Sequence, residues 1–393
     1  MKRWATAVAA VGIFLASWTL LHQLWYRSAG EIVDTPGYET YGDAIVAGQV
    51  PYRDFAVEYP PGALLPMLAP EVTASKGNFG EYGHSFEKWM AGAGVLMVLL
   101  VALVASPLRV LLVAVSPLLL GNLMLSRFDL WVAALTVGAL VALLRDRRTT
   151  SAIALGAAIA TKLFPAVIAP IALVWIWRRD GRRAALVWLA AVAGVCAVVF
   201  LPFAAIAPGG LGHSFGVQLN RPLQIESLGA AILIAVHNAA GTTLHVFTTK
   251  SQNLSGPGAH AAAVVSSVAQ IAALLAVWVL YARGPQTRER LVRYAAAAVV
   301  AFVAFDKVLS PQYMVWLIPL VPLVRSRLAQ VFLVAALVLT QIEFPARYWS
   351  FVALHPGIAT VVLWRDLVLV ALFSLLVTEP RRERVEETAL FVR

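Results

Sequence analysis

The sequence predicts an all-α, polytopic membrane protein of about twelve spans, and three observations lead to this fold class. Of the 393 residues, 60% are apolar and 13% are charged, and the mean hydropathy is +0.77. A soluble domain has about 45–50% apolar and about 25% charged residues. The apolar residues also fall in runs that are separated by Arg clusters, Pro and Gly. A bilayer accommodates such runs, whereas a soluble fold has no interior large enough to bury them.

The spans are expected where the apolar runs approach the roughly 20 residues that a perpendicular helix needs. The first run follows Lys2 and Arg3 and continues to about Trp25 without a small-residue cleavage site, which favours an uncleaved span over a signal peptide. Several later runs are short and interrupted by Pro, so the number of spans stays open between about ten and thirteen. The predicted spans are 6–26, 86–106, 108–125, 128–144, 150–163, 164–177, 184–203, 259–282, 291–306, 311–324, 328–343 and 357–378.

The distribution of charge predicts the orientation of these spans. With both termini in the cytoplasm, 20 of the 31 Lys and Arg residues lie on the inner side, but only 7 of the 21 acidic residues. An excess of Lys and Arg in short inner loops is the positive-inside rule. We therefore expect both termini to be cytoplasmic, and we attribute the pI of about 10.0 to topology rather than to nucleic-acid binding.

Two long outer segments, 27–85 and 204–258, are rich in Tyr, Pro, Gly, Asn and acidic residues. Long loops in compact proteins are commonly functional. Because the chain has neither an internal repeat nor a low-complexity linker, one transmembrane domain is expected over 1–378, followed by a charged cytoplasmic tail over 379–393.

The first outer segment offers a candidate general base. Asp34 lies about eight residues after the first span, and a carboxylate held near the membrane surface suits removal of a proton from a substrate hydroxyl. Residues 38–47 could form a short amphipathic helix in the interface plane, with Tyr38, Tyr41 and Ile45 on one side. The alternative is that these tyrosines form an interfacial belt and that the Asp residues make turns.

Ionisable side chains also lie near the outer ends of several spans: Arg127, Asp129, Lys162 and Lys307, with Arg365 a turn or two inside the last span. Charges at membrane depth are costly and therefore indicate function. Four cations on one face could bind a phosphate group. Structural ion pairs and snorkelling side chains are the alternative.

The sequence gives no reason to expect a metal or a nucleotide. The spacing of His213, His237 and His245 fits no metal signature, and no Gly-rich phosphate loop is present. With Cys196 as its one cysteine, the chain can form neither an intrachain disulfide nor a Cys-based metal site.

An ordered set of motifs resembles glycosyltransferase family 87, whose members are membrane enzymes of the GT-C class. The resemblance covers about residues 30 to 320. The motifs lie at residues 34–38, 48–55, 58–61, 126–129, 161–165, 221–227 and 307–313.

This resemblance implies a GT-C fold that transfers a sugar from a polyprenyl-phosphate donor to a lipid or glycan acceptor. The reaction would take place on the outer face of the bacterial cytoplasmic membrane, with inversion at the sugar and without a cofactor or metal. Mannose is the expected sugar, as in the α-mannosyltransferases of phosphatidylinositol mannoside synthesis, and arabinofuranose is the alternative. A transporter or flippase of a lipid-linked sugar is the competing class, which would bind the same ligand without making a bond.

The resemblance also implies roles for individual residues. By its pattern the first outer segment is catalytic and Asp34 is the base, with Asp43 and Asp54 left open as alternatives. The donor phosphate would be held by Lys162, Lys307, Arg127 and Arg365. The residues expected to bind sugar or acceptor are Tyr38, Asp43, Glu58, Tyr59, Asp129, Arg221, Glu226 and Gln312.

Overall fold

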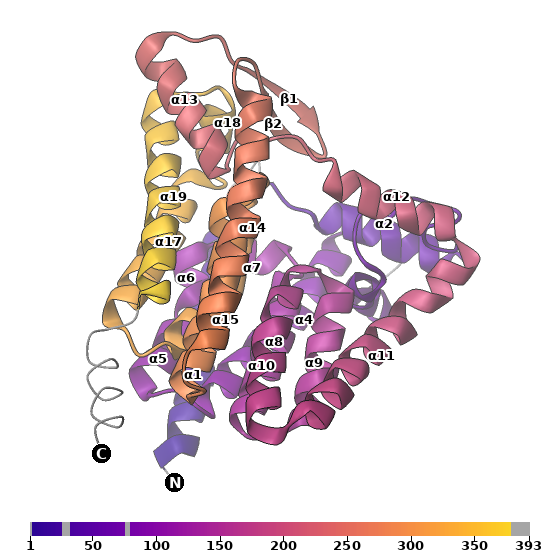
Figure 1. Ribbon diagram of the computed structural model, residues 1–393. Coiled ribbons are helices and arrows are strands. Elements are labelled where there is room, and N and C mark those ends of the chain that lie inside the picture. The colour runs from indigo at the N-terminus through magenta and orange to yellow at the C-terminus, as the bar shows by residue number, and fades with distance from the viewer. Residues whose placement is uncertain (1, 26–31, 75–78, 379–393) are drawn as a thin grey trace, which may run out of the picture.

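The structure is a computed structural model that describes residues 2–25, 32–74 and 79–378. In these ranges the chain folds into helices and one two-stranded antiparallel hairpin (Figure 1). The all-α character expected from the sequence is thereby confirmed. The predicted tail, 379–393, lies outside the described residues.

Five helices in the described part of the chain are long and apolar enough to cross a membrane. They are α1 (Lys2–Trp25), α4 (Phe79–Ala102), α11 (Arg182–Ile206), α14 (Ala259–Arg283) and α19 (Pro356–Val377). The other α-helices are α2 (Thr35–Val46), α3 (Leu64–Leu68), α5 (Pro107–Ala114), α6 (Ser116–Leu120), α7 (Leu123–Ser126), α8 (Asp129–Leu144), α9 (Arg148–Thr161), α10 (Ala169–Asp180), α12 (Pro208–Leu219), α13 (Leu228–Ala240), α15 (Arg288–Phe305), α16 (Met314–Leu317), α17 (Arg327–Glu343) and α18 (Tyr348–Val352). Short 3-10 helices are η1 (Pro61–Ala63), η2 (Ala69–Val72), η3 (Phe164–Ile168), η4 (Pro311–Tyr313) and η5 (Val321–Leu323), and the hairpin pairs β1 (His245–Thr249) with β2 (Ser251–Ser255).

The expected twelve spans are not confirmed, and several of the predicted ones are short or broken. The range 108–125 is divided into α5, α6 and α7, with a break at Gly121, whose φ of 73° an L-residue rarely adopts. The range 311–324 consists of η4, α16 and η5. Pro319 lies between α16 and η5, and a proline lacks the N–H that a helix interior needs. The ranges 150–163 and 164–177 form α9 and the η3–α10 segment.

Helices α8 and α15 lie at the centre of the molecule. Helix α8 packs against α4 and α9, and α15 packs against α14 and α19, which run beside it in Figure 1. The four consecutive alanines at 295–298 in α15 are fully buried. Small side chains allow helix backbones to approach closely, as is usual in membrane bundles.

The two predicted outer segments contain more regular structure than loops would. The first holds α2, which confirms a helix close to the range predicted for it. The second holds the end of α11, α12, α13 and the hairpin, and Figure 1 shows these elements gathered away from the start of α1. The two segments pack closely against each other at Gly210 and Tyr52. A Cβ atom added to Gly210 would lie only 1.8 Å from the carbonyl oxygen of Tyr52.

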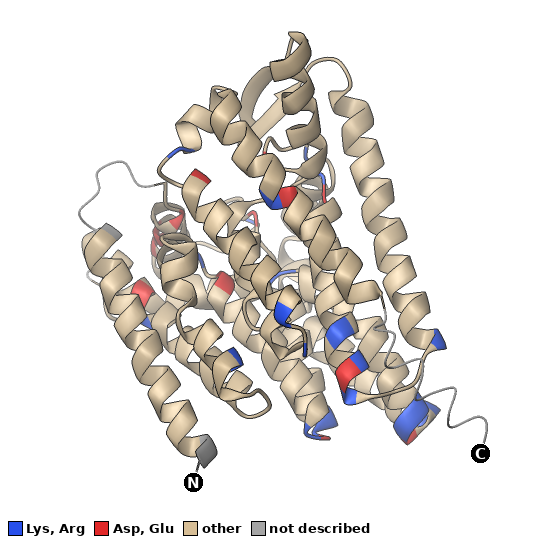
Figure 2. Cartoon of the chain, turned by 90° about the vertical axis from the view of Figure 1, so that its left-hand side faces the viewer, with Lys and Arg blue, Asp and Glu red and all other residues tan. Residues whose placement is uncertain are grey.

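Lys and Arg gather at the opposite end of the bundle, where α1 begins (Figure 2). At this end, Arg179 and Arg288 lie 2.9 and 3.0 Å from the two carboxylate oxygens of Asp146. The positive charge that the sequence concentrates in short loops thus lies at one end of the bundle.

Candidate active site

A cavity of about 860 Å³ opens between the two outer segments and the ends of the central helices. Its wall includes ten of the thirteen residues that the sequence analysis singled out. These ten are Asp34, Tyr38, Glu58, Tyr59, Arg127, Lys162, Arg221, Glu226, Lys307 and Gln312. Asp43, Asp129 and Arg365 are not in the wall.

Asp34 is positioned at the cavity wall by the first turn of α2. It is the residue before that helix, and its carbonyl oxygen accepts hydrogen bonds from the N–H groups of Gly37 and Tyr38 at 3.0 and 3.2 Å. Its Oδ2 atom lies 3.0 Å from Nε of Arg127 and accepts a hydrogen bond from the Tyr38 hydroxyl at 3.3 Å. Its Oδ1 atom accepts no hydrogen bond from the described residues, so it is available to a ligand.

The other two candidate bases occupy different surroundings. Asp54 is exposed and pairs with Arg53 at 2.9 Å, which lowers the pKa of Asp54 to about 2. Asp43 lies further along α2, outside the cavity wall, and its buried Oδ1 atom has no partner among the described residues. Of the three carboxylates that the sequence left open, Asp34 is therefore the one that lines the cavity.

Arg127 holds the first outer segment against the bundle. The side chain is only 4% exposed, and its Nε atom donates to Oε1 of Gln312 at 2.9 Å as well as facing Asp34. Two further nitrogens donate to the carbonyl oxygens of Ser126 and Ile32, at 3.3 and 3.4 Å. These contacts fix the guanidinium and, with it, the carboxylate of Asp34.

Lys162 is neutralised by a carboxylate behind the cavity wall. Its Nζ atom donates to Oδ1 of Asp129 at 2.6 Å, and Nε1 of Trp316 donates to the same oxygen at 2.6 Å. The Trp316 ring stacks between Phe164 and Tyr313, with centroids at 3.8 and 4.1 Å. Asp129, which the sequence analysis expected to contact sugar or acceptor, is fully buried in this cluster.

The cavity wall carries further cations. Lys307 donates to the carbonyl oxygen of Leu219 at 3.0 Å, and Arg221 donates to Oγ of Ser251 at 2.7 Å. Lys250, at the tip of the β-hairpin, forms an ion pair with Glu58 of the first outer segment. Lys250 is not among the residues expected from the sequence, because an exposed lysine in a turn has no pattern that distinguishes it from a solvated residue.

Arg365 lies behind the cavity wall instead of in it. The side chain is fully buried, pairs with Asp366 at 2.9 Å and donates to the carbonyl oxygen of Glu226. Burial and the nearby carboxylate of Glu343 raise the pKa of Glu226 well above its ordinary value. Arg365 therefore supports the segment that carries Glu226.

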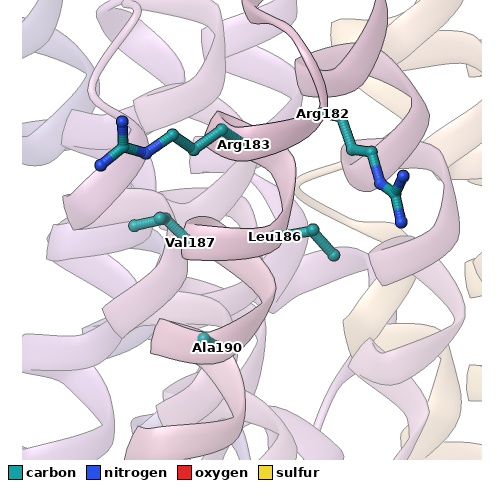
Figure 3. Close-up of a pocket in the computed structure, with 5 residues that line it drawn as sticks. All are labelled: Arg182, Arg183, Leu186, Val187 and Ala190. Atoms are coloured by element: carbon teal, nitrogen blue, oxygen red, sulfur yellow. The ribbon is translucent and has the colours of Figure 1, made fainter.

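A separate hollow of about 510 Å³ lies at the start of α11, where Arg182, Arg183, Leu186, Val187 and Ala190 line it. Figure 3 shows the two arginine side chains pointing to opposite sides of the helix. Side chains that diverge in this way cannot enclose a substrate. Among the described residues, no group of three or more His, Cys, Asp or Glu side chains is placed to hold a metal ion.

Comparison with known proteins gives one family. The sequence pattern of glycosyltransferase family 87 matches residues 57–311, which is more than half of the chain. The matched range contains Glu58, Lys162 and Lys307 of the cavity wall, whereas Asp34 precedes it. No curated protein matches the chain.

Proposed function

The chain belongs to glycosyltransferase family 87, and on this premise we propose that it transfers a sugar from a polyprenyl-phosphate donor to a lipid or glycan acceptor. The observation that carries the proposal is the placement of Asp34. Its carboxylate lines a cavity of about 860 Å³, is held by Arg127 and Tyr38, and keeps Oδ1 free of hydrogen bonds from the described residues.

In the proposed reaction, the hydroxyl oxygen of the acceptor attacks the anomeric carbon of the donor sugar. As it attacks, Oδ1 of Asp34 accepts the proton of that hydroxyl group. The bond between the anomeric carbon and the donor phosphate breaks on the opposite face, so the configuration inverts. The pair of electrons leaves with the phosphate. Arg127 and Tyr38 hold the carboxylate in the orientation that this attack needs.

Cations in the same cavity would stabilise the charge that develops on the departing phosphate. Lys307, Arg221 and Lys162 line the cavity, and Lys162 also lies beside the aromatic cluster. A lipid phosphate brings its own leaving group, so the proposal needs no nucleotide, metal or other cofactor.

The sugar would lie between these cations and Asp34, beside Glu58, Tyr59 and Gln312 of the wall. Carboxylate and amide groups bind sugar hydroxyls, and aromatic faces stack on sugar rings. We propose mannose as the sugar, with arabinofuranose as the alternative, because both follow from the motif resemblance rather than from any single contact.

We further propose that the cavity faces the outside of a bacterial cytoplasmic membrane. The support is the distribution of charge: Lys and Arg gather at the end of the bundle where α1 begins, and the outer segments lie away from it (Figures 1 and 2). Positive charge in short loops marks the cytoplasmic side.

The test is a transfer assay with the purified protein in liposomes, labelled polyprenyl-phosphate-mannose and a membrane extract as the source of acceptors. Asp34→Asn should abolish transfer, because the amide cannot accept the proton. Asp43→Asn is the matched control, since Asp43 lies on the same helix outside the cavity wall, and it should retain transfer.

Loss of transfer in Asp43→Asn with retention in Asp34→Asn would show that the base is misassigned. If wild type transfers neither mannose nor arabinose, the proposal fails, and uptake of labelled donor into the opposite leaflet would then indicate a flippase.

A further inference from the structure

A cluster of buried ionisable side chains lies at one part of the cavity wall. It contains three carboxyl groups and one guanidinium group, and each of the four residues is at most 1% exposed. They are Glu226, Glu343, Arg365 and Asp366. Glu226 is the member of this cluster that lines the cavity, so its protonation state bears on what the cavity can bind.

The cluster has one cation for three acidic groups. Arg365 pairs with Asp366 at 2.9 Å, and it reaches the main-chain carbonyl oxygen of Glu226 rather than the carboxyl group. Both oxygens of Glu343 are buried without a hydrogen-bond partner among the described residues. Since a buried carboxylate without a cation is costly, the charge of Asp366 is balanced and a charge on Glu226 would not be.

The hydrogen bonds of Glu226 indicate where its proton lies. Oε2 accepts a hydrogen bond from Nε2 of Gln224 at 2.9 Å, whereas Oε1 is buried and has no partner among the described residues. A neutral carboxyl group accepts at one oxygen and donates from the other, so Oε1 is the donor. Burial and the neighbouring carboxyl group of Glu343 raise the pKa of Glu226 well above its ordinary value, in agreement with this neutral form.

The segment that carries Glu226 is joined to cations of the cavity wall. The N–H group of Gln224 donates to the carbonyl oxygen of Lys307 at 3.0 Å, and Arg221 lies three residues before Gln224. All four residues line the cavity. An ionised carboxylate here would repel an anion that these cations attract, whereas a neutral acid can donate a hydrogen bond to it. A sugar hydroxyl does not need this neutral form, because it can donate to a carboxylate.

We propose that Glu226 is a neutral carboxylic acid in the cavity wall and that its Oε1–H group donates a hydrogen bond to an oxygen of the phosphate that leaves the sugar. The assignment of that oxygen rests on the proposed function, whereas the neutral state of Glu226 does not. The proton stays on Glu226 throughout, and the hydrogen bond strengthens as negative charge develops on the phosphate. Two carboxyl groups of one cavity thus have different roles: Asp34, beside Arg127, accepts a proton, and Glu226 donates a hydrogen bond.

Infrared spectroscopy of the protein in liposomes tests the neutral state without any substrate. A protonated carboxyl group has a carbonyl-stretch band that a carboxylate lacks, and Glu226→Gln should remove part of this band at neutral pH. Glu289→Gln is the matched control, because Glu289 is an exposed partner of Arg325, and it should leave the band unchanged.

Transfer rates at neutral pH test the hydrogen bond. Glu226→Gln should keep most of the kcat, because the amide is uncharged and still donates. Glu226→Met has a similar length but no donor, and it should lower kcat about 100-fold, as removal of one donor to a developing anion does. The KM should change less than kcat, since the bond gains its strength in the transition state. Thermal unfolding of both variants shows whether each is folded.

The pH profile of transfer is a third measurement. Glu226 is neutral below its raised pKa and ionised above it, so the wild-type kcat should fall as the pH rises into the alkaline range. Glu226→Gln should not share this fall. The other ionisable groups that face Glu226 are the same in both proteins: Glu343 of α17, Tyr348 of α18, Arg365 and Asp366 of α19, and Tyr313 of η4.

A band that Glu226→Gln leaves intact would overturn the neutral state. A kcat in Glu226→Gln as low as in Glu226→Met, or an alkaline fall that Glu226→Gln shares, would overturn the hydrogen bond. If Glu226→Gln removes part of the band but the wild type transfers no sugar, the proposed function fails and the neutral Glu226 stands. Transfer by the wild type with a band that Glu226→Gln does not change would do the reverse.

Discussion

Nε of Arg127 lies 3.0 Å from Oδ2 of Asp34, and this contact joins two parts of the chain that are 93 positions apart. Arg127 follows a short buried helix, α7, whereas Asp34 precedes α2 in the first outer segment. The same nitrogen also donates to Gln312, so three distant segments meet at one guanidinium. The orientation of the candidate base is thus determined by residues outside its own segment.

Arg127→Gln should lower the rate of sugar transfer by about 10- to 100-fold, because a small displacement of a catalytic group has effects of that size. The expected change is in kcat, since Asp34 would remain present but poorly oriented. Initial rates at saturating donor measure it. Arg53→Gln removes an exposed partner of Asp54 and serves as the control. An unchanged kcat in Arg127→Gln would show that the contact has no part in catalysis.

Asp129→Asn should destabilise the protein, because it removes the partner of Lys162 inside a nearly closed aromatic cluster. Breaking a buried ion pair costs about 3–5 kcal/mol. Thermal unfolding in detergent, followed by tryptophan fluorescence, measures the effect. The double variant Asp129→Asn with Lys162→Met should recover much of the lost stability. If the double variant is as unstable as the single one, the charge of Lys162 is not the cause.

Arg365→Met should reduce stability rather than donor affinity. Its loss would leave Asp366 and Glu343 buried without a cation and free the carbonyl oxygen of Glu226. The expected cost is about 3–5 kcal/mol. Thermal unfolding and the KM for the donor are measured on the same preparation. A raised donor KM at unchanged stability would instead place Arg365 at the phosphate, as the sequence analysis expected.

Two neighbouring glycines of α12 should respond differently to alanine. A Cβ atom at Gly210 would meet the carbonyl oxygen of Tyr52 at 1.8 Å, whereas at Gly209 it would meet nothing within 4 Å. Gly210→Ala should therefore push the two outer segments apart and lower both transfer and thermal stability. Gly209→Ala should be neutral or stabilise by up to about 1 kcal/mol, since alanine favours a helix. Equal behaviour of the two variants would contradict this close approach.

The sequence predicted the kind of fold, and ten of the thirteen residues that it singled out line the cavity. Hydropathy indicated a helical membrane protein because apolar runs of this length have no other stable environment. The same measure cannot distinguish a membrane span from a buried, broken helix, since both are apolar. The range 108–125, predicted as one span and divided into three helices at a proline and Gly121, is an example.

The sequence by itself determined which ionisable residues lie in or near the apolar runs, where a charge is costly. Tertiary structure alone decided which of them pair: Asp34 with Arg127, Lys162 with Asp129, and Arg365 with Asp366 behind the wall. Ion pairing depends on distances of a few ångströms between segments far apart in the chain. Local patterns carry no information on those distances, and packing of the helices sets them.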